Sequence, residues 1–339
     1  MIVHENSRRK WVHSGSLIGH KDTVFSLASA PDEKTVASSS RDGSVRIWDR
    51  SSRACIGYWD TADGWVRQVF FLDSGKAIAA AGWSKCMIWS PASRNVSTIL
   101  EGDRITISAS PRGTVLSIGT ELGEVTLVDS RSIKVIGRLE LFDRPTTTVT
   151  VSRDDAVVLA AGSGAVAKIN VATRSLEWKS EGHDPTILIG QILVLDSLGL
   201  VVSCSHDGSA RVWDFNTGKA VAVLEDEGGV VAAAISPDGQ SLFTQGMRSR
   251  LWDTKSWTIR RTLPGEEGVF KAQFLPDGER IIAACPDGCL RMRDTQNGRL
   301  LQSLSVSSRR LLDLLLCENA AEVLVCGDDP VCSIWKQTS

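Results

Sequence analysis

The chain has 339 residues, of which 42% are hydrophobic, and its 38 Lys and Arg against 40 Asp and Glu leave a net charge of −2. That balance argues against broad nucleic-acid binding, which needs a surplus of basic residues on one face. No stretch approaches the roughly 20 apolar residues that span a membrane, and no apolar run at the N-terminus indicates a secretory signal. We therefore expect a cytoplasmic protein, with the nucleus as an open alternative.

The eight cysteines lie mostly inside strand-like runs, so we expect reduced core residues and no disulfide framework. Cys285 with Cys289, and Cys326 with Cys332, each supply two thiolates, whereas zinc sites normally take four ligands. The sequence contains no P-loop, no dinucleotide-binding glycine pattern and no HExxH motif. We therefore predict no metal site, no cofactor and no catalytic residue.

Short strand-like runs separated by turns follow one another along the whole chain. Residues 1–10 are predicted to be a mobile tail, and residues 11–18 to form a strand. Four further strands are expected at 23–30, 35–40, 44–49 and 54–60, with Asp, Pro and Gly in the turns between them. The apolar run at 309–317 could pass for a helix, but it stands where the other units have their first strand. This pattern predicts antiparallel sheet and no convincing helix.

The chain also repeats itself. The segment SSSRDGSVRIWD at 38–49 returns as SCSHDGSARVWD at 203–214, with weaker copies elsewhere. A period of about 40 residues is typical of propellers and solenoids. The residues at the Trp position of each copy are Trp48, Trp89, Val128, Ile169, Trp213, Trp252, Arg293 and Trp335. Their spacing is 41, 39, 41, 44, 39, 41 and 42 residues, so no unit is hidden and the count is eight.

Residues 11–336 resemble the WD40-repeat family. The pairs that carry the resemblance are Gly19-His20 with Trp48-Asp49, and Gly182-His183 with Trp213-Asp214. The other six units lack the Gly-His pair. The resemblance implies an all-β fold: a single eight-bladed β-propeller of four-stranded blades, followed by a C-terminal end at 337–339. A seven-bladed ring, the commoner form in this family, is the alternative.

The two ends of the chain predict how the ring closes. The last unit reaches only its third strand at 331–336, whereas residues 11–18 precede the first strand of unit one and read like a fourth strand. We expect residues 11–18 to complete the last blade, because an open sheet edge at the seam is thereby removed.

His20, Asp42 and Trp48, and again His183, Asp207 and Trp213, could be mistaken for pieces of a catalytic site. Ser38 or Ser40, and Ser203 or Ser205, would add a hydroxyl group. The family resemblance implies a buried hydrogen-bond chain that links His to Asp and Ser, and Ser to the Trp N–H. Two copies of one constellation favour a structural role, because an enzyme needs its catalytic site once.

The resemblance also implies that ligands meet one face of the ring, around the channel mouth. Carried onto this sequence, that face consists of the loop leading into each first strand and the turn before each third strand. Neighbouring units eight, one and two supply the residues predicted to bind a partner: Phe25, Arg41, Trp65, Arg67, Trp83 and Arg310. Unit six supplies Gln245 and unit seven Phe270. Because Trp and Arg are enriched at binding hot spots and guanidinium groups grip carboxylates or phosphates, this sector suits an acidic or phosphorylated peptide.

Three functions stay open at this point. The favoured one is a non-catalytic module, monomeric on its own, that binds a protein or peptide partner and neither nucleic acid nor membrane. The second is a structural subunit that packs into a larger assembly through its rim or underside. The third is an enzyme built on a propeller, such as the quinone-dependent dehydrogenases, but the channel-mouth positions hold no acidic cluster for the calcium that such enzymes use.

Overall fold

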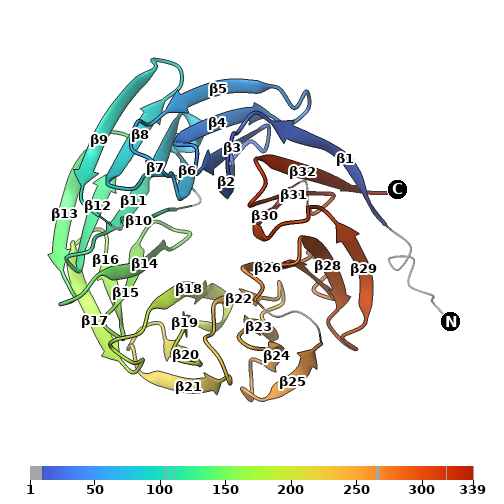
Figure 1. The fold of residues 1–339 in the computed structure, drawn as a ribbon. Helices are drawn as coiled ribbons and strands as arrows, with labels where there is room; N and C mark the ends of the chain where they lie inside the picture. Colours follow the sequence, from blue (N-terminus) through green and yellow to red (C-terminus); the bar gives the residue numbers. More distant parts are fainter. Residues whose placement is uncertain (1–9, 104, 111, 265–267, 318, 339) are drawn as a thin grey trace.

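The computed structural model describes residues 10–103, 105–110, 112–264, 268–317 and 319–338. These residues form eight four-stranded antiparallel sheets arranged in a ring, as Figure 1 shows. The predicted eight-bladed β-propeller is confirmed, and the seven-bladed alternative is wrong. The predicted tail falls almost entirely on residues 1–9, which lie outside the described residues.

The first four blades follow one another in chain order. Blade 1 comprises β2 (Val24–Ser29), β3 (Thr35–Ser40), β4 (Ser44–Asp49) and β5 (Cys55–Asp60). Blade 2 comprises β6 (Gln68–Leu72), β7 (Ala77–Ala81), β8 (Lys85–Ser90) and β9 (Asn95–Glu101), with a 3-10 turn, η2 (Asp73–Gly75), after β6. Blade 3 comprises β10 (Thr106–Ala109), β11 (Val115–Gly119), β12 (Glu124–Asp129) and β13 (Lys134–Glu140). Blade 4 comprises β14 (Thr146–Val151), β15 (Val157–Gly162), β16 (Ala165–Asn170) and β17 (Ser175–Glu181).

The remaining blades continue the same order until the last one. Blade 5 comprises β18 (Ile189–Leu195), β19 (Leu200–Ser205), β20 (Ser209–Asp214) and β21 (Ala220–Glu225), with the 3-10 turn η3 (Asp196–Leu198) after β18. Blade 6 comprises β22 (Ala232–Ile235), β23 (Ser241–Gln245), β24 (Ser249–Asp253) and β25 (Ile259–Leu263). Blade 7 comprises β26 (Lys271–Phe274), β27 (Arg280–Ala284), β28 (Cys289–Asp294) and β29 (Leu300–Ser305). Blade 8 comprises β30 (Leu311–Cys317), β31 (Glu322–Gly327), β32 (Val331–Gln337) and, from the other end of the chain, β1 (Trp11–Ile18).

Strand β1 closes the ring. It pairs antiparallel with β32 from Trp11 opposite Gln337 to Ile18 opposite Val331, with one bulge between His13 and Gly15. Beyond this ladder, the Thr338 N–H donates to the Lys10 carbonyl at 2.8 Å. The predicted closure is confirmed, and blade 8 is the only blade in the described structure built from both ends of the chain (Figure 1).

The hydrophobic core lies between the blades. Each of its eight clusters contains buried side chains from two neighbouring blades; Trp48 of blade 1, for example, packs with Leu324 and Ile334 of blade 8. Both faces of each sheet are therefore covered, which explains why the second strands of the blades are buried along nearly their whole length.

The innermost strands, which line the centre of the ring in Figure 1, have no strand partner on their inner edge. Some of their backbone N–H groups donate to side chains of the preceding blade in the ring. The Ile107 N–H donates to Gln68 Oε1 at 2.9 Å, the Ala233 N–H to Gln191 Oε1 at 2.7 Å, and the Leu27 N–H to Asp313 Oδ2 at 2.9 Å. These bonds link neighbouring blades, and the last of them links blade 8 to blade 1.

The recurring Asp after the Trp position has a backbone role. Asp49, Asp214 and Asp253 each end a third strand, and their Oδ1 atoms accept backbone N–H bonds from residues two or three positions later. Four residues after these aspartates the backbone has positive φ, at +70° for Gly218 and +55° for Trp257. The side-chain bonds hold the tight turn into the fourth strand, and glycine adopts its backbone angles without the steric penalty that Trp257 carries.

Candidate interaction surface

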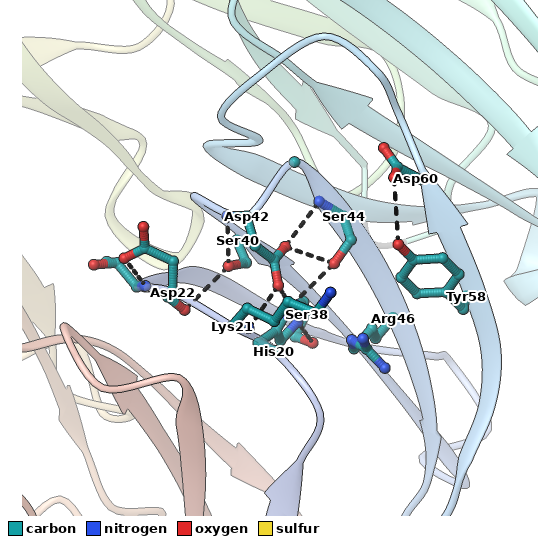
Figure 2. Close-up of polar contacts among 12 residues, drawn as sticks. His20, Lys21, Asp22, Ser38, Ser40, Asp42, Ser44, Arg46, Tyr58 and Asp60 are labelled. Atoms are coloured by element: carbon teal, nitrogen blue, oxygen red, sulfur yellow. Dashed lines mark hydrogen bonds and ion pairs between the residues drawn. The ribbon is translucent and has the colours of Figure 1, made fainter.

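Two buried hydrogen-bond networks stiffen blades 1 and 5. In blade 1, His20 Nδ1 lies 3.0 Å from Asp42 Oδ2, and His20 Nε2 lies 2.7 Å from Ser38 Oγ (Figure 2). Trp48 Nε1 donates to Ser38 Oγ at 2.8 Å. The hydrogen bonds thus run from Asp42 through His20 and Ser38 to Trp48, and Ser38 is the hydroxyl that joins the imidazole to the indole. Ser40 instead accepts the Asp42 N–H and donates to a backbone carbonyl.

Blade 5 repeats this geometry. His183 lies 2.8 Å from Asp207 and 2.7 Å from Ser203, and Trp213 Nε1 donates to Ser203 at 2.9 Å. A second serine in each network was not predicted from the sequence: Ser44 donates to Asp42, and Ser209 donates to Asp207. The bridging serines, Ser38 and Ser203, could have been recognised because each stands ten residues before the Trp of its unit.

These networks set the protonation states of their members. Burial lowers the pKa of His20 and of His183, and the nearby carboxylate only partly opposes this. Burial alone would raise the pKa of Asp42, but bonds from the Ser44 hydroxyl and the Lys21 N–H lower it to about 2. The geometry is therefore that of a neutral imidazole that donates from Nδ1 to an ionised aspartate and accepts the Ser hydroxyl at Nε2.

A pH dependence of stability follows. A histidine whose pKa is lower in the folded state stabilises the fold fully above the unfolded value of 6.5, and this contribution is lost as the pH falls below it. The aspartates add a second loss as the pH falls from about 4 toward 2. Urea unfolding should therefore give a smaller free energy of unfolding at pH 5 than at pH 7. A His20→Gln/His183→Gln variant should be less stable at pH 7 but flatter between pH 6.5 and 5; an equally steep variant would contradict the assignment.

The predicted binding residues of blades 1 and 2 form one stack on the face of the ring that carries the turns before the third strands. We call Phe25, Arg41, Trp65, Arg67 and Trp83 the aromatic–arginine cluster. The ring centroids of Phe25 and Trp65 lie 6.2 Å apart, and those of Trp65 and Trp83 lie 5.5 Å apart. The Arg41 guanidinium carbon lies 4.2 Å from the centre of Trp65, and that of Arg67 lies 5.2 Å from Trp83.

The loop that leads into β6 presents this cluster. Val66 is fully buried, and its N–H donates to the Ser40 carbonyl at 3.0 Å. The flanking residues Trp65 and Arg67 therefore lie toward solvent, with Trp65 36% exposed. On the neighbouring turn, the Arg41 N–H donates to the Thr23 carbonyl at 2.8 Å, which holds the Arg41 side chain beside Trp65.

Two hollows meet at the cluster. The first, of about 600 Å³, is lined by Thr23, Phe25, Arg41, Trp65, Arg67, Phe270, Arg310, Leu312 and Asp328. The second, of about 420 Å³, is lined by Arg67, Gly82, Trp83, Asp103, Ile105 and Glu121. The structure thus brings Arg310 of blade 8 to the same hollow as Arg41 and Trp65, as the sequence predicted, and adds Phe270 of blade 7, which stood outside the predicted sector.

The three arginines of the first hollow differ in their charge partners. Arg310 Nε lies 2.8 Å from Asp328 Oδ2, and Arg41 Nε lies 3.9 Å from Asp22 Oδ2. Arg67 has no carboxylate within ion-pair distance among the residues that the structure describes. Arg67 lines both hollows and is exposed, so it is the guanidinium best placed to take an external anion.

One position that the sequence assigned to this face lies elsewhere. Gln245 is completely buried at the end of β23, where its Nε2 donates to the Gly246 carbonyl. Strand β24 of blade 6 has five residues and β4 of blade 1 has six, so counting back from the Trp position overshoots by one residue. The exposed residues of this turn are Met247 and Arg248.

The described residues contain no group of three or more His, Cys, Asp or Glu side chains arranged to hold a metal ion. All eight cysteines are free thiols, and most are buried. Within the described part of the chain, no helix is long and apolar enough to cross a membrane.

Comparison with solved structures supports the architecture. The computationally designed Ika8 protein superposes with a TM-score of 0.80 at 18% sequence identity, covering 95% of this chain and 98% of that one. At this identity the likeness concerns the fold alone. The fold and its buried networks define a repeat protein of the β-propeller class.

Sequence comparison then gives the family. The model described as "WD domain, G-beta repeat" matches residues 11–49 and 177–214. Periodic tryptophan protein 2 of Saccharomyces cerevisiae is 25% identical over 244 residues, and WD repeat-containing protein 55 of Arabidopsis thaliana is 20% identical over 222 residues. Two of the eight units thus match the WD40 repeat, and these matches support a WD40-repeat protein; propellers of that family typically serve as non-enzymatic scaffolds that bind other proteins.

These relatives are longer than the matched region. The yeast match covers 65% of this chain but 22% of the yeast protein, and the Arabidopsis match covers 61% of this chain and 62% of that protein. The intraflagellar transport protein 122 homolog of Mus musculus is 31% identical over 112 residues, which is 33% of this chain and 9% of the mouse protein. Similarity of this extent identifies the repeat and leaves the partner of this chain to be found.

Proposed function

We propose that this propeller is a non-catalytic interaction module that binds an extended segment of a protein partner across the first hollow, between blades 8, 1 and 2. The observation that carries the proposal is the aromatic–arginine cluster, which combines exposed tryptophans with an uncompensated guanidinium, Arg67. Tryptophan side chains provide contact area at a low cost in conformational entropy, and Trp and Arg are enriched among the residues that dominate interface energies.

We further propose that the bound segment is acidic or phosphorylated. The first hollow is lined by three arginines, Arg41, Arg67 and Arg310, and among its described lining residues by one carboxylate, Asp328. The second hollow offers Arg67 against Asp103 and Glu121, so its charge favours an anion less. An anionic group seated in the first hollow would contact Arg67 and compete with Asp22 for Arg41.

The proposal involves a single copy of the chain in a cytoplasmic or nuclear setting, and no nucleic acid or membrane. The net charge of −2 supports a partner other than nucleic acid. The free state of all eight cysteines supports a reducing compartment.

Peptide binding tests this function. Arrays of acidic and phosphoserine peptides, each beside its Gln or Ser counterpart, should yield segments that bind only in the anionic form. For such a segment, Arg67→Ala should weaken binding about tenfold or more, since a hydrogen bond to a charged group contributes about 1.5–3 kcal/mol. Trp65→Ala should cost at least as much, because truncating a hot-spot aromatic costs about 2 kcal/mol or more.

The matched control is Arg299→Ala, an exposed arginine at the β28–β29 turn, which lies at the opposite end of the strands from the turns of the mouth. It should leave the affinity unchanged. Affinity capture from native lysate with the wild-type protein and with an Arg41→Ala/Trp65→Ala/Arg67→Ala variant would then identify the natural partner. Equal recovery by both proteins, with the variant folded, would refute this binding site.

A further inference from the structure

A cavity distinct from the two hollows lies in blade 8, and no residue of the aromatic–arginine cluster lines it. It has a volume of about 350 Å³, which falls within the range of small-ligand pockets. The residues around it come from β1, β31, β32 and the loop between blades 7 and 8. They are His13, Ser16, Val306, Ser307, Arg310, Leu311, Val325, Cys326, Gly327, Asp329, Pro330, Val331 and Ser333.

This cavity occupies a place that a ring fills in other blades. The backbone N–H groups of Phe142, His183 and Ser307 donate to the carbonyls of Gly123, Gly164 and Gly288 at 3.2, 3.0 and 3.1 Å, so the three residues hold equivalent positions in blades 4, 5 and 8. The rings of Phe142 and His183 are buried there. Blade 8 has only a hydroxymethyl group at the same position, which leaves the volume of a ring unfilled.

Two further replacements enlarge the space. In blade 1, Arg46 and Tyr58 pair across β4 and β5, with the guanidinium carbon 4.7 Å from the centre of the phenol ring (Figure 2). The residues in register with them in blade 8 are Ser333 and Ser16, which pair across β32 and β1. Two long side chains are thus replaced by two small hydroxyls that line the cavity.

The polar groups of the networks in blades 1 and 5 are partly retained in blade 8. Asp329 stands where blade 1 has Asp42, and it accepts a hydrogen bond from the Ser307 hydroxyl. Trp335 pairs with Val323 as Trp48 pairs with Val36. Its Nε1 is buried, and no group among the described residues accepts its hydrogen bond.

The missing acceptor has a simple cause. The bridging hydroxyl of blade 1, Ser38, pairs with Arg46, and the residue at the same register in blade 8 is Val325, which pairs with Ser333 and lines the cavity. Blade 8 therefore keeps the carboxylate and the indole N–H of the network but lacks the imidazole and hydroxyl that join them.

We propose that this cavity binds a planar nitrogen heterocycle of the imidazole type, with its N–H toward Asp329. Such a ring fills the place of the side chain that blade 8 lacks, and it donates to the carboxylate at the position where blades 1 and 5 pair an aspartate with their histidine. The apolar wall of Val306, Leu311 and Val325 covers its faces. Because Arg310 lines both this cavity and the first hollow, the heterocycle can be the histidine of a protein partner or a free small molecule.

Indole N–H resonances of the ¹⁵N-labelled protein test the proposal directly. The Trp335 signal is assigned with Trp335→Phe, and imidazole, benzimidazole and N-acetylhistidine amide are titrated as probes. At least one probe should move the Trp335 signal in a saturable manner, because the Trp335 ring lies 5.3 Å from the ring of His13, which lines the cavity. The signals of Trp48 and Trp213 serve as internal references and should stay in place, because serine hydroxyls already accept their hydrogen bonds at 2.8 and 2.9 Å.

Filling the cavity should abolish this response. Ser307→His places the imidazole of blades 1 and 5 in blade 8, and Ser333→Arg restores the long side chain of blade 1; each should weaken probe binding at least tenfold. Lys219→His, which adds the same side chain at an exposed turn, should change nothing. Retained affinity in both cavity-filling variants, or no saturable shift of Trp335 with any probe, would overturn the proposal. Tighter binding of N-acetylhistidine amide than of benzimidazole points to a partner histidine, and the reverse order points to a small molecule.

Discussion

A chain that lacks residues 1–18 is expected to lose its cooperative fold. The deletion removes β1, which pairs with β32 along its length and buries Trp11 and Leu17 to within 2% of full burial. Each such side chain contributes about 1.5–3 kcal/mol by burial alone. The ladder of β32 becomes an open edge, and the total stability of a folded domain is only about 5–15 kcal/mol. We expect aggregation, or the loss of a cooperative thermal transition by circular dichroism.

A circular permutant is the control for this deletion, because it keeps the residues of β1 but moves them to the C-terminal end of the chain. It begins at Gly19 and carries residues 10–18 after residue 338, where the Thr338 N–H already bonds the Lys10 carbonyl at 2.8 Å. The permutant contains the same eight blades in unbroken chain order, so it should be soluble and melt within a few degrees of the wild type. A truncated chain with the melting temperature of the wild type would show that β1 is dispensable.

The second large effect is expected from Glu322→Ala, which should lower the free energy of unfolding by about 3–5 kcal/mol. Glu322 begins β31 of blade 8 and is 2% exposed. Its Oε1 accepts two hydrogen bonds from Arg50 of blade 1, at 3.1 and 2.9 Å, and its Oε2 lies 3.2 Å from Lys336 Nζ. Removing the carboxylate takes away both of these hydrogen bonds from the buried Arg50 guanidinium. Urea unfolding measures the loss.

A double variant provides the control for this ion pair. Arg50→Met/Glu322→Leu removes both charges and fills their space with apolar groups, so it should be more stable than Glu322→Ala alone. Arg50→Met, Glu322→Leu and this double variant, with the wild type, form a double-mutant cycle, and a coupling energy above about 1 kcal/mol is expected for a buried pair. A loss below about 1 kcal/mol on Glu322→Ala would place this pair among weak surface salt bridges.

Much of the fold could be predicted because every blade repeats one local solution. The turn residues, the β-favouring runs between them and the Asp that ends most third strands act over a few residues, so they can be recognised in the sequence. The interval of about 40 residues then counted the blades, and the missing fourth strand of the last unit predicted the closure by residues 11–18. The hydrogen bonds of the His20 network were expected from the resemblance to the WD40-repeat family.

The candidate sites depended on contacts that no local pattern contains. Gln245 was misplaced by a difference of one residue in strand length, and Phe270 reaches the first hollow from blade 7, far along the chain from Trp65. The ion pair of Arg310 with Asp328 distinguishes that arginine from Arg67, although both looked equally available in sequence.

The sequence alone therefore determined the repeat, the number of blades and the way the ends join, because these follow from short-range patterns copied eight times. Only the tertiary structure decided which arginine keeps an uncompensated charge, which serine bridges His20 and Trp48, and where Ser307 leaves a cavity. The physical reason is that charge pairing and packing volume are set between blades, by side chains that are neighbours in space and distant in sequence.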